Sequence, residues 1–211
     1  MGLLDKIFGK INNNNLTSNE NQDLNQFPKT SEMLNEDKFW DIIESSLKKT
    51  TNQDEQEQFL IKEIGKLTLN EIIGFRLKTD KLLYDTYSSE MWCAAYVING
   101  GCSDDGFEYF RCWLISRGKE VYYKAKENPD SLIEFLSEEE EDIFDFESFW
   151  YVALNAFENK TGKSLYDYID YDNFIFGEGN YLQFDFSWEE EDPESMRKIC
   201  PNLFERFFEN Q

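Results

Sequence analysis

The chain of 211 residues contains no histidine, and none of its four cysteines forms a Cys-x-x-Cys pair. Without histidine, this chain cannot by itself assemble a Ser-His-Asp or Cys-His catalytic centre. A zinc site would need thiolates from scattered positions, so we expect no metal and no cofactor. We expect free, buried thiols in a reducing, cytoplasmic compartment.

Long apolar runs are also absent. No stretch approaches the roughly 18 apolar residues that a transmembrane helix needs, and the start of the chain shows no small-residue cleavage site. We therefore expect neither a transmembrane segment nor a secretory signal. Aromatic residues, by contrast, make up 17% of the chain. Each buries a large apolar area, so the composition predicts a compact core.

Basic residues are scarce: 21 Lys and Arg stand against 43 Asp and Glu, a net charge of −22. Residues 127–211 hold 5 basic and 23 acidic residues, a net charge of −18. Such a field repels nucleic acid and attracts basic proteins, so we expect a basic protein partner and no nucleic acid. A surface that only keeps the protein soluble is the alternative.

Two acidic runs form the candidate partner surface, with an aromatic residue beside the second. Its residues are Glu138, Glu139, Glu140, Glu141, Trp188, Glu189, Glu190, Glu191 and Asp192. Aromatic side chains dominate interface hot spots, so Trp188 is the candidate anchor. The alternative for Trp188 is ordinary core packing.

Residues 1–35 are predicted to form an amphipathic arm and a flexible polar linker. The arm, residues 1–11, places its apolar side chains on one helical face, and the Asn-rich run after it has too few apolar residues to fold alone. The arm could associate weakly with a membrane, bind a partner or pack on its own domain. The sequence leaves these three open, together with the oligomeric state.

Residues 36–211 are predicted to form one all-α domain with an acidic C-terminal part. Asn35 and Thr68 are expected N-caps, Thr68 in a capping box with Glu71, and Gly162 is an expected helix end. Alternating apolar residues near 174–187 predict a small β-hairpin as the one exception.

The stretch "VINGGCSDDGFEYFRCWLISRG", residues 97–118, permits two interpretations. In the structural one, Gly100 or Gly101 ends a helix and Ser103 or Asp105 caps the next, with Glu108 at capping-box spacing from Asp105. In the functional one, carboxylates and arginines form a pocket for acid–base work or for a polar ligand. The candidate pocket comprises Trp92, Asp104, Asp105, Glu108, Arg111 and Arg117.

The segments "DKFWDIIESS", "MWCAAYVINGGCSDDGFEYFRCWLISRGKEVYYKAKENPDSL" and "FWYVALNAFENKTG" are similar to a bacterial family known as domain of unknown function 4240. The resemblance covers residues 36–169 and, loosely, the last residues of the chain. It implies a small cytosolic helical domain. It supplies no activity, cofactor or catalytic residue that could be carried over to this chain.

Two functional hypotheses follow from these observations. The first is a non-catalytic acidic binding protein, immunity- or antitoxin-like, that neutralises a basic partner. The alternative is an enzyme or small-ligand-binding domain that uses the carboxylates and arginines of residues 104–117.

Overall fold

The computed structural model describes residues 27–137, 144–176 and 180–209, and within these ranges every regular element is helical. The predicted all-α class is therefore confirmed. The helices are α1 (Glu36–Lys49), α2 (Gln53–Ile64), α3 (Leu69–Asp85), α4 (Ser89–Asn99), α5 (Asp104–Ser116), α6 (Lys119–Glu127), α7 (Val152–Thr161), α8 (Pro193–Ile199) and α9 (Pro201–Phe207). Short 3-10 helices are η2 (Pro129–Glu134), η3 (Glu147–Tyr151) and η4 (Leu165–Tyr168).

Local capping signals in the sequence set several of these helix ends. The Asn35 side chain accepts a hydrogen bond from the amide of Lys38, and both bonds of the Thr68–Glu71 capping box are present. Gly162 ends α7 in the left-handed conformation, with φ of 69°. These predicted caps are confirmed because each depends only on residues a few positions apart.

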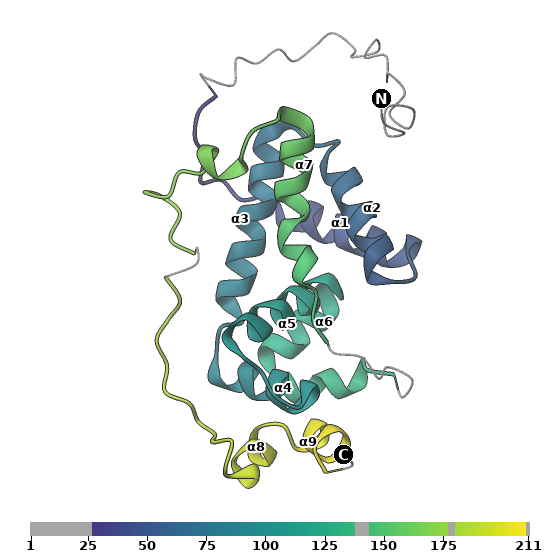
Figure 1. Ribbon diagram of the computed structural model, residues 1–211, viewed down its shortest axis with the longest axis vertical. Helices are drawn as coiled ribbons and strands as arrows, with labels where there is room; N and C mark the ends of the chain where they lie inside the picture. The colour runs from purple at the N-terminus through teal and green to yellow at the C-terminus, as the bar shows by residue number, and fades with distance from the viewer. Residues whose placement is uncertain (1–26, 138–143, 177–179, 210–211) are drawn as a thin grey trace, which may run out of the picture.

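In Figure 1, α7 lies between the long helix α3 and α2 and packs against both. Arg76 on α3 stacks its guanidinium carbon 3.6 Å from the ring centroid of Trp150. Its Nη1 donates to the Trp150 carbonyl at 2.9 Å, and its Nη2 pairs with Asp80 at 2.8 Å. The contact between Arg76 and Trp150 therefore fixes α3 against η3, which directly precedes α7.

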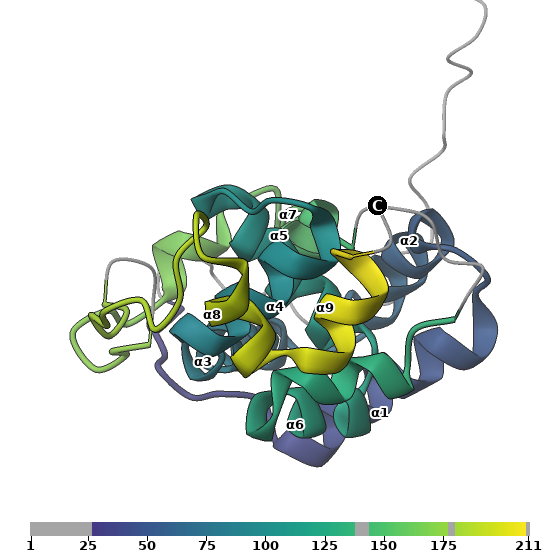
Figure 2. The same ribbon diagram turned by 90° about the horizontal axis from the view of Figure 1, so that it is seen from below.

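Helices α8 and α9 lie across one end of the domain, against α4 and η2 (Figure 2). The buried carboxylate of Asp130 on η2 accepts the amides of Asn202 and Leu203, each at 3.0 Å. These are among the first amides of α9, which have no partner within their own helix. Asp130 thus caps α9 from a distance and joins the acidic C-terminal part to the same core.

The residues before α1 pack on the domain, which corrects the predicted boundary at residue 36. Leu34 is buried, and its amide donates to the Gly74 carbonyl on α3 at 2.9 Å. The amide of Thr30 donates to the Tyr168 carbonyl at 3.0 Å. The segment from Phe27 to Asn35 is therefore part of the folded unit. The predicted arm at residues 1–11 lies outside the described residues.

The predicted β-hairpin near 174–187 is wrong for the part of that segment that the structure describes, 174–176 and 180–187. Residues 180–187 run as an extended chain along one side of the helices (Figure 1). Tyr181 stacks on Tyr87 with ring centroids 4.2 Å apart, and Phe184 packs on the same ring at 5.3 Å. The aromatic residues that predicted a strand therefore pack on the connection between α3 and α4, and no second strand pairs with them among the described residues.

Among the described residues, no helix is long and apolar enough to cross a membrane.

Candidate functional site

The stretch 97–118 joins two helices through a tight loop. Gly100 ends α4 with φ of 66°, and Gly101 follows with φ of 140°. Both angles lie in the region that favours glycine. The Ser103 hydroxyl then caps α5 by accepting the amide of Gly106 at 3.1 Å. Of the two expected caps, Ser103 is the one used, and the Asp105–Glu108 capping box is wrong because α5 begins one residue before Asp105.

Asp104 and Asp105 occupy the first turn of α5, where both are exposed. Negative charge at this end of a helix interacts favourably with the helix dipole. Glu108, one turn later, is half-buried and has an interaction partner within the protein. Among the described residues, neither Asp104 nor Asp105 forms a hydrogen bond or ion pair with Arg111.

Arg111 lies in the core, where only 1% of its surface is exposed. Its Nη1 donates to the Leu83 carbonyl at 2.6 Å and its Nε to the Phe107 carbonyl at 3.2 Å. The guanidinium also lies over the rings of Tyr87, Phe107 and Tyr181. Since Leu83 is in the last turn of α3, a cation here satisfies a carbonyl at the negative end of that helix.

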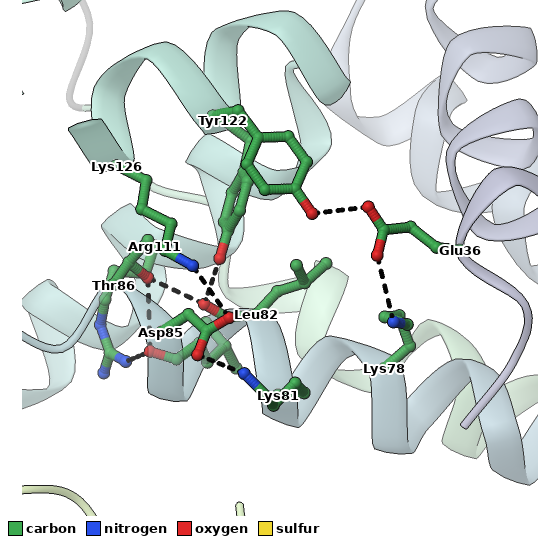
Figure 3. A network of polar contacts seen from close by, with 11 residues as sticks. Glu36, Lys78, Lys81, Leu82, Asp85, Thr86, Arg111, Tyr122 and Lys126 are labelled. Atoms are coloured by element: carbon green, nitrogen blue, oxygen red, sulfur yellow. Dashed lines mark hydrogen bonds and ion pairs between the residues drawn. The ribbon is translucent and has the colours of Figure 1, made fainter. Parts of the chain in front are cut away.

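The neighbouring residues complete the C-terminal cap of α3 (Figure 3). The Tyr122 hydroxyl donates to the Leu82 carbonyl at 2.7 Å, and the Thr86 hydroxyl donates to the same oxygen at 3.1 Å. Burial raises the pKa of Tyr122 well above its ordinary value, so this donor keeps its proton. Lys126 pairs with Asp85 at 3.0 Å at the surface of the same cluster. The polar groups around Arg111 therefore hold three helices together.

Trp92 lies near this cap, since its ring contacts Tyr87 and Phe107 as the Arg111 guanidinium does, whereas Arg117 lies at the C-terminal end of α5. The Trp92 indole donates to the Cys102 carbonyl at 3.2 Å and its ring stacks on Phe107 at 4.4 Å, so it closes the α4–α5 loop. Arg117 follows the last residue of α5 and lines a cavity of about 570 Å³ with residues of the α1–α2 turn. The structure therefore places Trp92 and Arg111 around shared rings but does not bring Arg117 into the same pocket.

The second acidic run of the predicted partner surface forms an exposed turn, Glu189–Asp192, which we call the acidic turn. Its four side chains are exposed, and none forms an ion pair with a described residue. The Asp192 amide donates to the Glu189 carbonyl at 3.1 Å, and the Ser195 hydroxyl accepts the Glu189 amide at 2.9 Å. The backbone of the turn is thus well defined. The first acidic run, Glu138–Glu141, lies outside the described residues.

Trp188 is buried, so the alternative of ordinary core packing holds for this residue and the candidate role as anchor does not. Its indole nitrogen donates to the Ser89 carbonyl at 3.0 Å, and its ring packs on Tyr96 at 5.1 Å. Burial, with Glu190 as a further cause, raises the pKa of Tyr96. Trp188 therefore fixes the acidic turn to α4. The neighbouring Phe186 is 53% exposed and was not singled out by sequence reasoning.

The four cysteines are free, and three of them are buried. Burial raises the pKa values of Cys102 and Cys112 to about 12. A hydrogen bond to the neighbouring Cys93 and then burial raise the pKa of the Cys200 thiol. Protonated thiols are poor nucleophiles. Among the described residues, no three His, Cys, Asp or Glu side chains lie close enough together to hold a metal ion.

The fold and these positions define a helical domain with an acidic turn at one end and an arginine-lined cavity elsewhere. The family model described as "Protein of unknown function (DUF4240)" matches residues 34–159, more than half of the chain, so the chain belongs to this family. No curated protein and no solved structure matches the chain. The matched range begins at Leu34 and includes Arg111 and Arg117, whereas the acidic turn lies beyond it.

Proposed function

We propose that this protein is a non-catalytic binding protein that recognises a basic protein partner through the acidic turn. The supporting observation is the turn itself: four consecutive exposed carboxylates on a backbone fixed by Trp188 and Ser195. Like charges this close repel one another and destabilise the folded state slightly. Such an arrangement is of use where a cationic surface neutralises it.

An apolar contact beside the turn supports the same proposal. Phe186 is half exposed, and its ring contacts Trp92 at 5.3 Å and Trp188 at 5.6 Å. Leu182, four residues earlier, is 63% exposed. An exposed aromatic side chain that packs on other rings beside a charged surface is typical of an interface hot spot. Phe186 therefore replaces Trp188 as the proposed anchor.

In its finer form, the proposal is an immunity-like protein of the bacterial cytoplasm that neutralises a basic toxin such as a nuclease. Complementary charge accelerates association and suppresses wrong partners, as rapid neutralisation requires. The free thiols support a reducing compartment. Raised thiol pKa values and the absence of histidine support a role without catalysis.

The experiment is affinity capture from the native host with three versions of the full chain. The turn variant carries Glu189→Gln, Glu190→Gln, Glu191→Gln and Asp192→Asn. The Asp192 side chain makes no capping hydrogen bond to α8, so we expect the fold to be unchanged. The control variant loses the same charges at four exposed carboxylates outside any described ion pair: Glu32→Gln, Asp41→Asn, Glu127→Gln and Glu158→Gln.

A basic protein captured by the wild type and the control variant, but not by the turn variant, is the expected result. Equal capture by all three versions would show that the acidic turn is not the binding surface. Loss with both variants would show that only net charge matters, which contradicts specific recognition by the turn.

A further inference from the structure

The chain between η4 and α8 covers one face of α3. Arg76 and Tyr84, eight positions apart on α3, lie on the same side of that helix. The Arg76 guanidinium lies 5.9 Å from the ring centroid of Tyr166. Farther along, the Tyr84 ring contacts Phe176 at 5.3 Å and Tyr181 at 6.2 Å. As far as the structure describes it, this chain therefore follows α3 from its middle to its C-terminal end (Figure 1).

The outer side of this chain carries large side chains that the domain leaves exposed. They are between 41% and 64% exposed, and we call them the apolar strip: Tyr166, Tyr171, Ile175 and Leu182. Burial raises the pKa of Tyr171 and the neighbouring Tyr166 raises it further, so the two rings lie close together. Ile175 and Leu182 stand next to Phe176 and Tyr181, which share one contact on α3. Exposed apolar side chains that gather in this way mark a contact surface.

The N-terminal segment enters the domain beside the apolar strip. The ring of Phe27, the first described residue, contacts the Tyr168 ring with centroids 5.8 Å apart. Tyr168 stands between Tyr166 and Tyr171 in the chain. Fifteen residues separate Phe27 from the arm, residues 1–11, and a chain of that length spans at most about 50 Å. The strip is therefore within reach of the arm, and the covalent connection raises the local concentration of the arm to the order of millimolar.

The composition of the arm complements the strip. Its apolar residues recur at helical spacing: Leu3, Leu4, Ile7, Phe8 and Ile11. Eleven residues are too few for a stable isolated helix in water, so a helix here needs a surface to pack on. The arm holds two Lys and one Asp, whereas residues 163–188 hold five acidic residues and one basic residue. Opposite net charges therefore favour the arm on this side of the domain.

We propose that the arm docks on the apolar strip of its own chain as a short amphipathic helix, with its apolar face against the strip. Of the three destinations that the sequence leaves open for the arm, this assigns its own domain. The inference goes beyond the proposed partner recognition, because the strip ends before the acidic turn begins. Its failure would leave that proposal standing.

Photocrosslinking of the full chain tests the contact directly. The photoreactive analogue p-benzoylphenylalanine replaces Phe8, and the joined peptides are identified by mass spectrometry. We expect crosslinks within one chain to residues 165–187. Ile175→Asp should lower their yield about fivefold or more, whereas Asn180→Asp, which adds the same charge at an exposed neighbour, should not. Crosslinks to another part of the domain, crosslinks between two chains, or none at all would overturn the proposal.

A second measurement needs no change in the strip. Carbon–proton correlation spectra of the full chain follow the methyl signal of Ile175, which is assigned with Ile175→Val. The arm variant carries Ile7→Asp and Phe8→Asp, and a control variant carries the same charge change between the arm and Phe27, at Leu16→Asp and Leu24→Asp. We expect the Ile175 signal to move in the arm variant alone. An unchanged signal in the arm variant, or an equal shift in both, would contradict docking on the strip.

Discussion

Gly74, in the middle of α3, is the point where the chain before α1 touches the helix most closely. A Cβ atom added there would lie 2.7 Å from the Leu34 nitrogen and 3.0 Å from the Glu32 carbonyl oxygen. Both are main-chain atoms, so no side-chain rotation relieves the clash. Gly74→Ala therefore forces the segment before α1 away from α3.

Two opposing effects set the magnitude of this change. Alanine favours a helix interior over glycine by roughly 0.5–1 kcal/mol. Against this stand the buried Leu34 side chain, about 1.5–3 kcal/mol, and the hydrogen bond from its amide to Gly74, about 1 kcal/mol. Since the segment shifts only partly, we expect a net loss of about 1–3 kcal/mol in the free energy of unfolding.

Urea denaturation measures this loss in the full chain. The sign should reverse in a chain that starts at Asn35, because the clashing atoms are gone and the helix propensity of alanine remains. That shortened chain keeps the Asn35 cap of α1 and should unfold cooperatively before the comparison is made. If Gly74→Ala were neutral or stabilising in the full chain, residues 32–34 would not pack on α3 as described.

Three further predictions concern the site. Arg111→Met should lower the unfolding free energy by about 2–4 kcal/mol, because carbonyls at the end of α3 lose a charged donor; a urea-measured loss below about 1 kcal/mol would contradict this. Asp105→Asn should change it by less than about 0.5 kcal/mol while Ser103→Ala costs about 1 kcal/mol, and the reverse order would make Asp105 the cap. A hydrogen bond from Tyr123 lowers the pKa of the Glu36 carboxyl in the folded protein. The ionised carboxylate therefore stabilises the fold fully above the unfolded pKa, and this stabilisation is lost as the pH falls through the lower folded pKa. Glu36→Gln should flatten acid unfolding there, and an unchanged profile would argue against this bond.

Much of the fold could be predicted from the sequence because helix ends depend on neighbouring residues. Asn35, Thr68 and Gly162 act where local rules place them. The β-hairpin prediction failed because an alternating pattern shows only that apolar side chains recur at every second position. It does not show whether they pack on a second strand or on helices. In the described residues, Phe184, Phe186 and Trp188 do recur at every second position, but they pack on Tyr87, Trp92 and Tyr96 of the helical domain, and no second strand pairs with them.

The site was less predictable because its contacts join residues far apart in the chain. Arg111 follows Glu108 by three positions, which suggested a shared pocket, but its partner is the Leu83 carbonyl, 28 residues away. Nothing in the sequence of the polar helix α2 indicates that Gln56 is buried. Its side chain nevertheless accepts a hydrogen bond from Arg117, 61 residues later, and orients that guanidinium. Likewise, nothing near Leu34 shows that a glycine on α3 makes room for it.

The salt dependence of association tests the proposed recognition by the acidic turn most directly. The rate constant for binding of the captured partner is measured at several salt concentrations for the wild type and for the turn variant of Glu189–Asp192. We predict a steep fall with salt in the wild type, and a rate about tenfold lower or more in the variant at low salt. A rate that is indifferent to salt and equal in both proteins would contradict recognition through the acidic turn.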